Sequence, residues 1–189
     1  MTEQEKALRG ELYEAGNDAA LTAERMEVKY RLQRYNQLDP RDLEQRTAHL
    51  KALLGKTGEQ LMIEQPFYCD YGRNIEVGEN FYANVNLVIL DCNRVTIGDN
   101  VLIGPNVGLH TAGHPLNIAQ RTQGLEYALP ITIGDNVWIG AGVNVVPGVC
   151  IGHNSVIGAG SVVTHDIPDN VVAAGIPCRV IKPIPTTAQ

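Results

Sequence analysis

The 189-residue sequence lacks the features of several large protein classes. No apolar run approaches the ~20 residues that a membrane-spanning helix needs. The N-terminal stretch MTEQEKALRGELYEAG is charged throughout and holds no apolar signal-peptide core. Positive charge is scarce as well, because 15 Lys and Arg stand against 21 Asp and Glu, a net charge of −6. A general nucleic-acid binder must neutralise phosphates, so we expect a cytoplasmic protein without nucleic-acid or membrane partners.

Clustered cysteines are also absent. The four cysteines lie far apart in the sequence, at Cys69, Cys92, Cys150 and Cys178. They form neither a CxxC pair nor a Cys/His spacing typical of zinc sites. We therefore expect buried, reduced thiols and no bound metal. The hydrophobic content of 44% and the charged content of 19% are ordinary for a globular domain.

A six-residue repeat occupies most of the chain from Val77 onward. Each unit begins with an aliphatic residue that is followed by a small residue, often glycine. The clearest units are IGDNVL, IGPNVG and LHTAGH from Ile97, then IGDNVW, IGAGVN, VVPGVC, IGHNSV, IGAGSV and VVTHDI from Ile133. β-Branched aliphatics favour strands, and Gly, Asn and Asp favour tight turns. Such a period is typical of a solenoid.

We therefore predict an all-β solenoid, a parallel β-helix in which three units close one triangular coil. The first aliphatic residue of each unit points inward, and successive coils stack these residues into columns. Parallel pairing between coils satisfies the backbone polar groups. The period itself carries no handedness.

The N-terminal region has helical rather than six-residue spacing. Apolar residues with this spacing occur throughout residues 3–54, at Leu8, Leu12, Met26, Tyr30, Leu43, Leu50, Leu53 and Leu54. Asp39 and Pro40 suit an N-cap and a first helical position, and Gly55 suits a helix stop. We predict an N-terminal α-helical cap at 1–57, which covers the open edge of a solenoid at 58–182. The segment NVVAAGIPCRVIKPI predicts a final strand, followed by a C-terminal tail at 183–189.

The repeat is interrupted at residues 113–130, between two regions that keep the six-residue phase. A long loop inside a compact repeat is usually functional. Leu125, Tyr127 and Leu129 predict that the loop is ordered and leans on another surface. Flat solenoid faces pack well against copies of themselves, which leads to the hypothesis of a cyclic oligomer.

Several segments together resemble the maltose and galactoside O-acetyltransferases. They are CDYGRNIEVGENFYANVNLVILD, TAGHP, PITIGDNVWIGAGVNVVPGVCIG and SVVTHDIPDNVVAAGIPCRVIK, and GELYEAGNDAAL is similar to the cap of the maltose type. The resemblance covers essentially the whole chain. It implies a left-handed coil, a homotrimer, acetyl-CoA bound in the groove between subunits, and direct transfer to a sugar hydroxyl. Asp70 and Cys92 favour the maltose type, because the galactoside type has serine and aspartate at these positions.

The resemblance implies that His114, in GHP, is the catalytic base. A sugar hydroxyl is too weak an acid to attack a thioester unaided, and histidine is suited to take its proton near neutral pH. Glu126 matches a loop glutamate that would orient this histidine or stabilise its positive charge; otherwise it is a solvated loop carboxylate. His110 lacks the motif match and is interpreted as a corner residue of its coil or a neighbour of the site.

The binding residues follow from the same resemblance. Four polar residues match the sugar site: Asp18, Asp70, Asn84 and Asp91. Asp and Asn are also ordinary corner residues, and a one-residue length difference affects the match of Asp18. Ala141 and Ala159 would meet the pantetheine and thioester through their backbones, and the Ala141 N–H is the candidate oxyanion donor.

The nucleotide end of the donor matches four further residues: Thr164, His165, Arg179 and Lys182. His165 stands where the family usually has lysine, which weakens one contact. Arg179 and Lys182 alternate in the last strand, so we predict that they face one side and hold phosphates.

Two other classes of protein are compatible with a β-helix. A β-helix metalloenzyme of the γ-carbonic-anhydrase kind needs three histidine ligands to zinc, and no third ligand is evident near the loop. A trimeric scaffold without catalysis is the other class, and the intact His114, Asn84 and Arg179 argue against it. Within the enzyme class, a galactoside or other glycoside acceptor stays open, because acceptor choice depends on pocket geometry.

Overall fold

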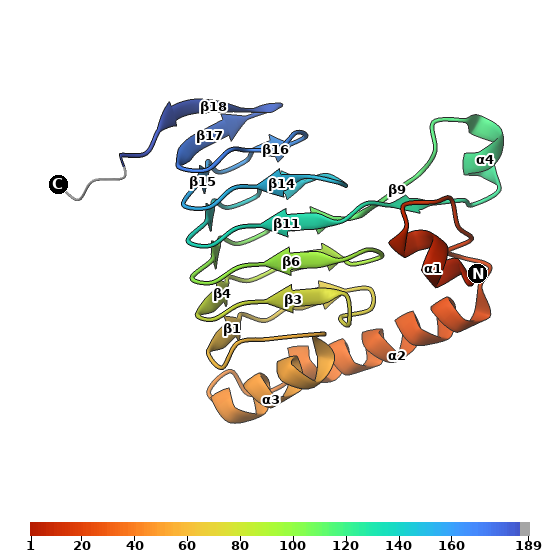
Figure 1. The fold of residues 1–189 in the computed structure, drawn as a ribbon. Coiled ribbons are helices and arrows are strands. Elements are labelled where there is room, and N and C mark those ends of the chain that lie inside the picture. Colours follow the sequence, from red (N-terminus) through yellow and green to blue (C-terminus); the bar gives the residue numbers. More distant parts are fainter. Residues whose placement is uncertain (186–189) are drawn as a thin grey trace.

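The chain folds into a stack of triangular coils that helices close at one end (Figure 1). The structure is a computed structural model that describes residues 1–185. Of the predicted tail at 183–189, residues 186–189 lie outside this range. Successive coils contribute one strand to each of three parallel sheets, and this arrangement confirms the predicted parallel β-helix.

The three sheets form the walls of the solenoid, here called faces 1, 2 and 3. Face 1 contains β1 (Leu61–Ile63), β4 (Phe81–Ala83), β7 (Leu102–Ile103), β12 (Trp138–Ile139), β15 (Val156–Ile157) and β17 (Val171–Gly175), and β18 (Cys178–Pro183) pairs antiparallel with β17. Face 2 contains β2 (Phe67–Cys69), β5 (Leu87–Leu90), β8 (Gly108–His110), β13 (Asn144–Val145) and β16 (Val162–Val163). Face 3 contains β3 (Ile75–Val77), β6 (Val95–Ile97), β11 (Ile131–Ile133) and β14 (Cys150–Ile151).

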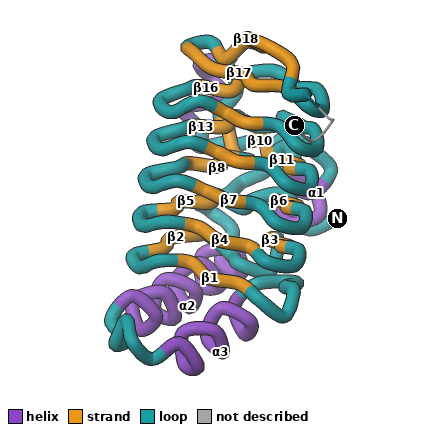
Figure 2. Tube along the Cα trace, turned by 90° about the vertical axis from the view of Figure 1, so that its left-hand side faces the viewer, coloured by secondary structure: helices purple, strands orange, loops and turns teal. Residues whose placement is uncertain are grey.

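The chain turns from face to face at three corners, which are visible as stacked loops in Figure 2. Corner 1–2, between faces 1 and 2, consists of residues 64–66, 84–86, 104–107, 140–143 and 158–161. Corner 2–3 consists of residues 70–74, 91–94, 111–130, 146–149 and 164–166. Corner 3–1 includes residues 78–80, 98–101, 134–137, 152–155 and 168–170. The candidate site residues of the solenoid lie mainly at the first two corners.

The first aliphatic residue of each unit points inward, as predicted. On face 3 the backbone register aligns Val77, Ile97, Ile133 and Ile151, and each is at most 3% exposed. Full burial of one such side chain stabilises a fold by about 1.5–3 kcal/mol. The columns therefore form the core of the solenoid.

Asparagine residues form a ladder along corner 3–1. Asn80, Asn100, Asn136, Asn154 and Asn170 have φ between 55° and 59°, a left-handed backbone that asparagine tolerates better than most residues. Their side-chain amides hydrogen-bond from coil to coil at 2.8–3.2 Å. The asparagine side chains of the turns thus satisfy each other's hydrogen-bonding groups along the stack.

Two helices cover the open edge of the first coil, as predicted. Helix α2 (Ala19–Asn36) and helix α3 (Leu43–Leu53) pack beneath β1 in Figure 1. The Tyr35 hydroxyl donates to the carbonyl of Ile63 at 2.5 Å, and Arg46 Nη2 donates to the same carbonyl at 3.0 Å. These hydrogen bonds satisfy a carbonyl group of β1, the edge strand that has no further coil below it. No helix in residues 1–185 is long and apolar enough to cross a membrane.

The start of α3 differs from the prediction. Its N-cap is Asp42, whose Oδ1 accepts a hydrogen bond from the Gln45 N–H at 3.0 Å. Asp39 instead forms an ion pair with Arg41 at 2.6 Å in the preceding turn. The Asp-Pro pair therefore marks that turn and not the helix start. The helix ends at Leu53, just before Gly55, as predicted.

The buried face of α2 and the position of the first helix also differ from the prediction. Met26 and Tyr30 are 60% and 54% exposed, because α2 turns Val28 and Leu32 toward the solenoid instead. Helix α1 (Glu3–Leu8) ends before Leu12 and lies beside the loop at 111–130 rather than beneath β1 (Figure 1). Several apolar residues of similar spacing made the buried face ambiguous.

One cysteine also departs from the prediction. Cys69, Cys92 and Cys178 are buried, whereas Cys150 is exposed on face 3. Its neighbour Ile151 occupies the inward position, and successive strand residues point to opposite sides. All four thiols are free.

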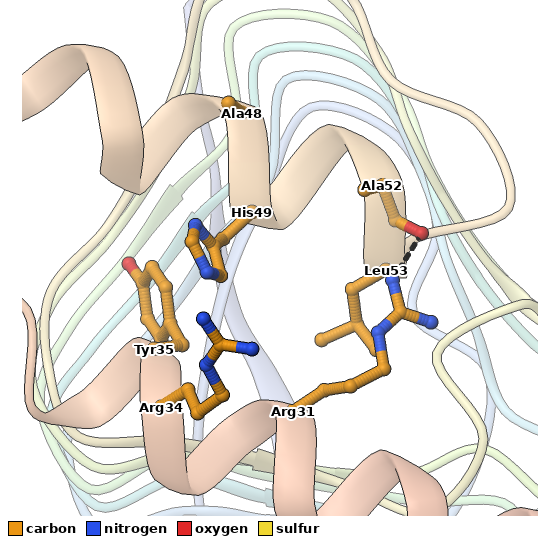
Figure 3. A pocket seen from close by; sticks show the side chains of 7 residues that line it. All are labelled: Arg31, Arg34, Tyr35, Ala48, His49, Ala52 and Leu53. Atoms are coloured by element: carbon orange, nitrogen blue, oxygen red, sulfur yellow. Dashed lines mark hydrogen bonds between the residues drawn. The ribbon is translucent and has the colours of Figure 1, made fainter.

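A cleft of about 360 Å³ lies between α2 and α3 (Figure 3). Arg31 extends from α2 to the carbonyl of Ala52 in the last turn of α3, where helix carbonyls have no partner within the helix. Arg34 and His49 lie beside each other in the same cleft. None of the predicted site residues lines it, so it is a feature of cap packing.

We expect Asn136→Ala to destabilise the solenoid more than Asn136→Gly. Both variants lose the ladder hydrogen bonds to Asn100 and Asn154. Alanine must also adopt the φ of 58°, whereas glycine adopts it freely. The free energy of unfolding in urea should be lower for the alanine variant than for the glycine variant by about 1–2 kcal/mol. Equal losses would contradict the importance of the left-handed backbone.

Candidate active site

The predicted catalytic loop leaves the stack at corner 2–3. Within residues 111–130, β9 (Ala112–Gly113) and β10 (Tyr127–Ala128) pair antiparallel and support α4 (Ile118–Thr122). The Leu129 N–H donates to the Thr111 carbonyl at 2.8 Å and closes the base of the loop. The loop is ordered, as predicted, and contains a ribbon and a short helix that the sequence pattern did not show.

His114 lies directly after β9, with a side chain that is 53% exposed. Its Nδ1 lies 3.1 Å from the carbonyl oxygen of Leu125. A carbonyl only accepts hydrogen bonds, so Nδ1 carries the proton of the neutral ring and Nε2 keeps its lone pair. Nε2 lies 3.9 Å from Glu126 Oε1. The structure thus brings the two predicted catalytic residues together, with a free basic nitrogen beside a carboxylate.

Glu126 is held in place by the N-terminal segment. Tyr13 and Glu126 exchange two backbone hydrogen bonds of 2.9 and 3.0 Å, and the Tyr13 hydroxyl donates to Glu126 Oε2 at 2.9 Å. Burial raises the pKa of Tyr13 well above its ordinary value, so the phenol remains a donor. Sequence reasoning missed Tyr13, because no spacing rule links two residues 113 positions apart.

Asp70 lies at the same corner, in the coil nearest the cap. Its Oδ2 accepts a hydrogen bond from the Cys92 thiol at 3.5 Å. Burial raises the pKa of Cys92 to about 12 and also raises the pKa of Asp70 above its ordinary value. Nearby, Arg25 donates to the Tyr71 hydroxyl at 2.6 Å. The corner therefore presents a half-buried acid that is partly supported by a neutral thiol.

Asp91, in the next coil away from the cap, supports this corner. The residue is 0% exposed, and its Oδ1 accepts hydrogen bonds from the N–H groups of Asp70 and Tyr71 at 3.0 and 2.9 Å. Its Oδ2 has no partner among the described residues. The side chain predicted to bind the sugar is thus buried in this structure, where it positions the backbone that carries Asp70.

Asn84 lies at a different corner from Asp70, and Asp18 lies at the start of α2. Asn84 belongs to corner 1–2, and its Oδ1 accepts a hydrogen bond from the Val85 N–H at 2.7 Å. Asp18 is the N-cap of α2, with Oδ1 accepting from the Leu21 N–H at 2.8 Å. Asn84 therefore does not meet the other predicted sugar-binding residues inside one subunit.

A groove of about 570 Å³ runs along face 1 and corner 1–2. Asn84, Ala141 and Ala159 line it, together with the exposed aromatic Trp138. In the described part of the chain, the backbone hydrogen bonds of this corner leave the Ala141 and Ala159 N–H groups without an acceptor. Small side chains and unpaired amides are suited to a ligand that lies directly on the backbone.

The C-terminal segment forms a hairpin of β17 and β18 instead of the predicted single strand. The pairing aligns Lys182 with Val172 and Arg179 with Ala174, and a bulge lies between these pairs. Because Val172 and Ala174 point the same way, Arg179 and Lys182 share one side of the hairpin. A regular strand would place residues three apart on opposite sides, so the bulge produces the predicted arrangement.

The remaining nucleotide-end residues lie one corner away. Thr164 and His165 belong to corner 2–3 in the coil next to this hairpin, and the Thr164 hydroxyl lies 2.9 Å from His165 Nδ1. The imidazole is exposed. The two residues therefore lie on a different edge of the stack from Arg179.

Other histidines are dispersed over the solenoid. His110 ends β8, and its Nε2 lies 3.0 Å from Asn144 Oδ1 on the same face. His153 belongs to corner 3–1, where its Nδ1 accepts from the Asp135 N–H at 2.9 Å. Among residues 1–185 no group of three or more His, Cys, Asp and Glu side chains could hold a metal ion.

Known protein families match both the helical cap and the repeats of the solenoid. The family model of the maltose acetyltransferase hexapeptide capping motif matches residues 6–58. The model of bacterial transferase hexapeptides matches residues 130–165, and that of the hexapeptide repeat of succinyl-transferase matches residues 94–114. These features define a hexapeptide-repeat acetyltransferase.

Similarity over most of the chain identifies a family within this class of acetyltransferases. Galactoside O-acetyltransferase of Escherichia coli is 53% identical over 164 residues, which cover 87% of this chain and 81% of the relative. A maltose O-acetyltransferase from Clostridium difficile is 51% identical with a TM-score of 0.96, over 98% of each chain. A galactoside acetyltransferase in complex with coenzyme A is 49% identical with a TM-score of 0.94, over 98% of this chain and 92% of that one. The chain belongs to the maltose and galactoside O-acetyltransferases, a family of acetyl-CoA-dependent sugar O-acetyltransferases with a left-handed β-helix.

We expect Asp91→Asn to stabilise the protein at alkaline pH. Burial raises the pKa of Asp91 from about 3.8 to about 6 in the folded chain. The folded state thus binds this proton more tightly than the unfolded state, so the stability contributed by Asp91 is full below about pH 4 and is lost as the pH rises through about 6. Asparagine keeps an acceptor for both amides and carries no charge.

The gain in free energy of unfolding should be on the order of 2 kcal/mol at pH 8 and near zero at pH 4. Urea unfolding of both proteins at the two pH values measures the difference, which cancels the titration of other groups. A variant that is less stable than the wild type at pH 8 would contradict the raised pKa.

Proposed function

We propose that the chain transfers the acetyl group of acetyl-CoA directly to a hydroxyl of a maltose-type sugar, with His114 as the general base. The observation that carries the proposal is the contact of His114 Nδ1 with the Leu125 carbonyl, which leaves Nε2 free beside Glu126. Family membership supports the reaction class. The related galactoside acetyltransferase that contains coenzyme A supports the donor.

The proton has a defined route in this proposal. As the sugar oxygen attacks the thioester carbon, His114 Nε2 takes the hydroxyl proton. The C–S bond then breaks, and the imidazolium returns the proton to the departing sulfur of coenzyme A. Glu126 stabilises the positive charge of the ring, as the acid of a catalytic triad does. The unpaired Ala141 N–H is the donor to the oxygen of the tetrahedral intermediate.

The donor is proposed to lie along the groove at corner 1–2. Ala141 and Ala159 are small enough for the pantetheine chain to approach their backbone amides. Beyond them, Arg179 and Lys182 lie on one side of the hairpin, where two cations can bind phosphates. We assign Thr164 and His165 to the nucleotide end of the donor site. His165 provides a weaker cationic contact than the lysine usual in this family.

The complete site is proposed to form between subunits of a homotrimer. Corners 1–2 and 2–3 of one coil bound opposite ends of face 2, where β5 has four residues. Such a strand is about 13 Å long, far more than one acetyl group spans. A second subunit would bring its groove to His114. Leu116 and Ile118 of the loop are 92% and 69% exposed, and such apolar side chains suit contact with a neighbour.

The acceptor is proposed to bind at Asp70, supported by Cys92. Asp91 positions the Asp70 backbone, Asp18 closes the site from the cap, and Asn84 reaches it from the neighbouring subunit. A panel of monosaccharides and disaccharides with acetyl-CoA, followed by release of free thiol, tests the function. Preferred turnover of galactosides would favour the alternative acceptor, and no thiol release with any sugar would contradict the proposal.

His114→Ala should lower kcat by about 10²–10⁴, the usual contribution of general-base catalysis. The KM for acetyl-CoA should stay near the wild-type value, because the base acts as the proton moves. His110→Ala is the matched control, since its ring bonds to Asn144 within face 2, and it should retain most activity. If His110→Ala abolished turnover while His114→Ala left kcat intact, His110 and not His114 would be the base.

Mixing two inactive variants tests the shared site. His114→Ala and Asn84→Ala change opposite walls, so a refolded equal mixture contains some interfaces in which both walls are intact. Random assembly should restore about a quarter of wild-type activity per subunit. The refolded mixture of His114→Ala with Glu126→Ala is the control, because both changes lie on one wall. Restoration in neither mixture would place the whole site within one subunit.

A further inference from the structure

The N-terminal segment at residues 1–17 packs against the base of the catalytic loop (Figure 1). Asn93, which is 2% exposed, joins the two, because its amide donates to the carbonyl of Ala7 at 2.9 Å and to the carbonyl of Ala128 at 2.8 Å. Ala7 and Ala128 also belong to one buried apolar cluster with Tyr13. The segment therefore forms a packed unit with the base of the loop.

The Tyr13 side chain has a fixed place in this unit. It is 1% exposed, and its ring packs in the buried cluster together with Cys92. A ring in a close-packed cluster keeps one rotamer, so the position of its hydroxyl is fixed as well. The phenol has a single proton, which it donates to Glu126 Oε2 at 2.9 Å. The neighbouring Cys92 thiol donates its own proton to Asp70.

Glu126 needs such a partner, because His114 does not hold its carboxylate. Oε1 lies 3.9 Å from His114 Nε2, which is longer than a hydrogen bond. Among residues 1–185 the Tyr13 hydroxyl is the one hydrogen-bond donor to the Glu126 side chain. Without this donor, the rotatable bonds of a half-buried glutamate allow its carboxylate to turn into solvent. The distance between the carboxylate and the imidazole therefore depends on Tyr13.

Burial also determines the direction of this hydrogen bond. Desolvation raises the pKa of Tyr13 well above its ordinary value, so the phenol stays protonated and donates. A donor that does not ionise attracts the charged carboxylate and never repels it. The two backbone hydrogen bonds between Tyr13 and Glu126 fix the main chain at the same point, so both ends of the glutamate are held. All these contacts lie inside one chain and do not depend on how subunits assemble.

We infer that Tyr13 is a positioning residue of the reaction, whose hydroxyl holds the Glu126 carboxylate where it stabilises the positive charge that His114 gains as the sugar oxygen attacks. The inference rests on the proposed function and extends it to the N-terminal segment. Tyr13 bonds to the carboxylate oxygen that faces away from the imidazole, so it acts through Glu126. Its effect falls on the chemical step and not on the binding of either substrate.

The test is steady-state kinetics of the full-length protein with acetyl-CoA and maltose. Tyr13→Phe keeps the buried ring and removes only the hydroxyl. It should lower kcat about tenfold, because neighbouring groups of one hydrogen-bonded network commonly couple by such a factor. The KM values for acetyl-CoA and maltose should change less than about twofold, since the interaction strengthens only as the imidazolium forms. Tyr35→Phe is the matched control, because it removes the hydroxyl of another ring that is 1% exposed, in the cap, and it should keep the wild-type kcat.

A double-mutant cycle separates positioning from a general structural role. Glu126→Ala removes the carboxylate that Tyr13 holds, so adding Tyr13→Phe to it should lower kcat by less than about twofold more. A residue that only supported the fold would lower kcat by the same factor in both backgrounds. Urea unfolding and light scattering record whether each variant folds and assembles. If Tyr13→Phe does not assemble, Glu126→Asp replaces it, because the shorter side chain withdraws the carboxylate from the Tyr13 hydroxyl, and a loss of about tenfold in kcat is again expected.

The results distinguish the positioning role from the proposed function on which it rests. A wild-type kcat in Tyr13→Phe, or in Glu126→Asp where that variant replaces it, would overturn the positioning role and leave the proposed function standing if His114→Ala loses turnover. Equal losses on adding Tyr13→Phe to the wild type and to Glu126→Ala would also overturn the positioning role. A wild-type kcat in His114→Ala would overturn the proposed function itself, and the positioning role with it.

Discussion

Each coil must lie against the next at the distance of paired β-strands, about 4.8 Å, and this constraint determines what the corners can hold. A Cβ atom on Gly104 would lie 2.7 Å from the Ala141 nitrogen, and one on Gly140 would lie 2.7 Å from the Ala159 nitrogen. Glycine is therefore required beneath each alanine. The same close stacking leaves alanine amides at the surface of corner 1–2, so the backbone of the proposed donor groove results directly from the packing of the solenoid.

Properties that depend on the local repeat could be predicted from the sequence. The inward position of Ile97 and Ile133 follows from the six-residue period, because every coil repeats the same burial pattern. The left-handed Asn residues follow from the turn chemistry of the repeat. The interruption before Ile131 marked the loop. These features need only neighbouring residues and a regular stack, whereas the role of His114 within the loop is a prediction from the family resemblance.

Properties that depend on distant contacts could not be predicted in this way. Tyr13 reaches Glu126 only because the N-terminal segment folds back beside the loop. Nothing in the sequence distinguishes the buried Asp91 from the half-buried Asp70, although burial separates their roles. The side shared by Arg179 and Lys182 depends on a bulge in a hairpin, which single-strand alternation does not describe. In each case the deciding information is a tertiary contact.

The loop at corner 2–3 leaves and re-enters the stack without shifting its register. β11 pairs with β6 although 33 residues separate the two strands, and the Leu129 N–H to Thr111 carbonyl bond closes the excursion at its base. The packing of the coils above and below therefore does not depend on the residues between these anchor points. Because the entropy of closing a loop grows only slowly with length, this corner tolerates insertion and deletion. The loop can therefore be replaced as a unit while the columns of aliphatic side chains remain unchanged.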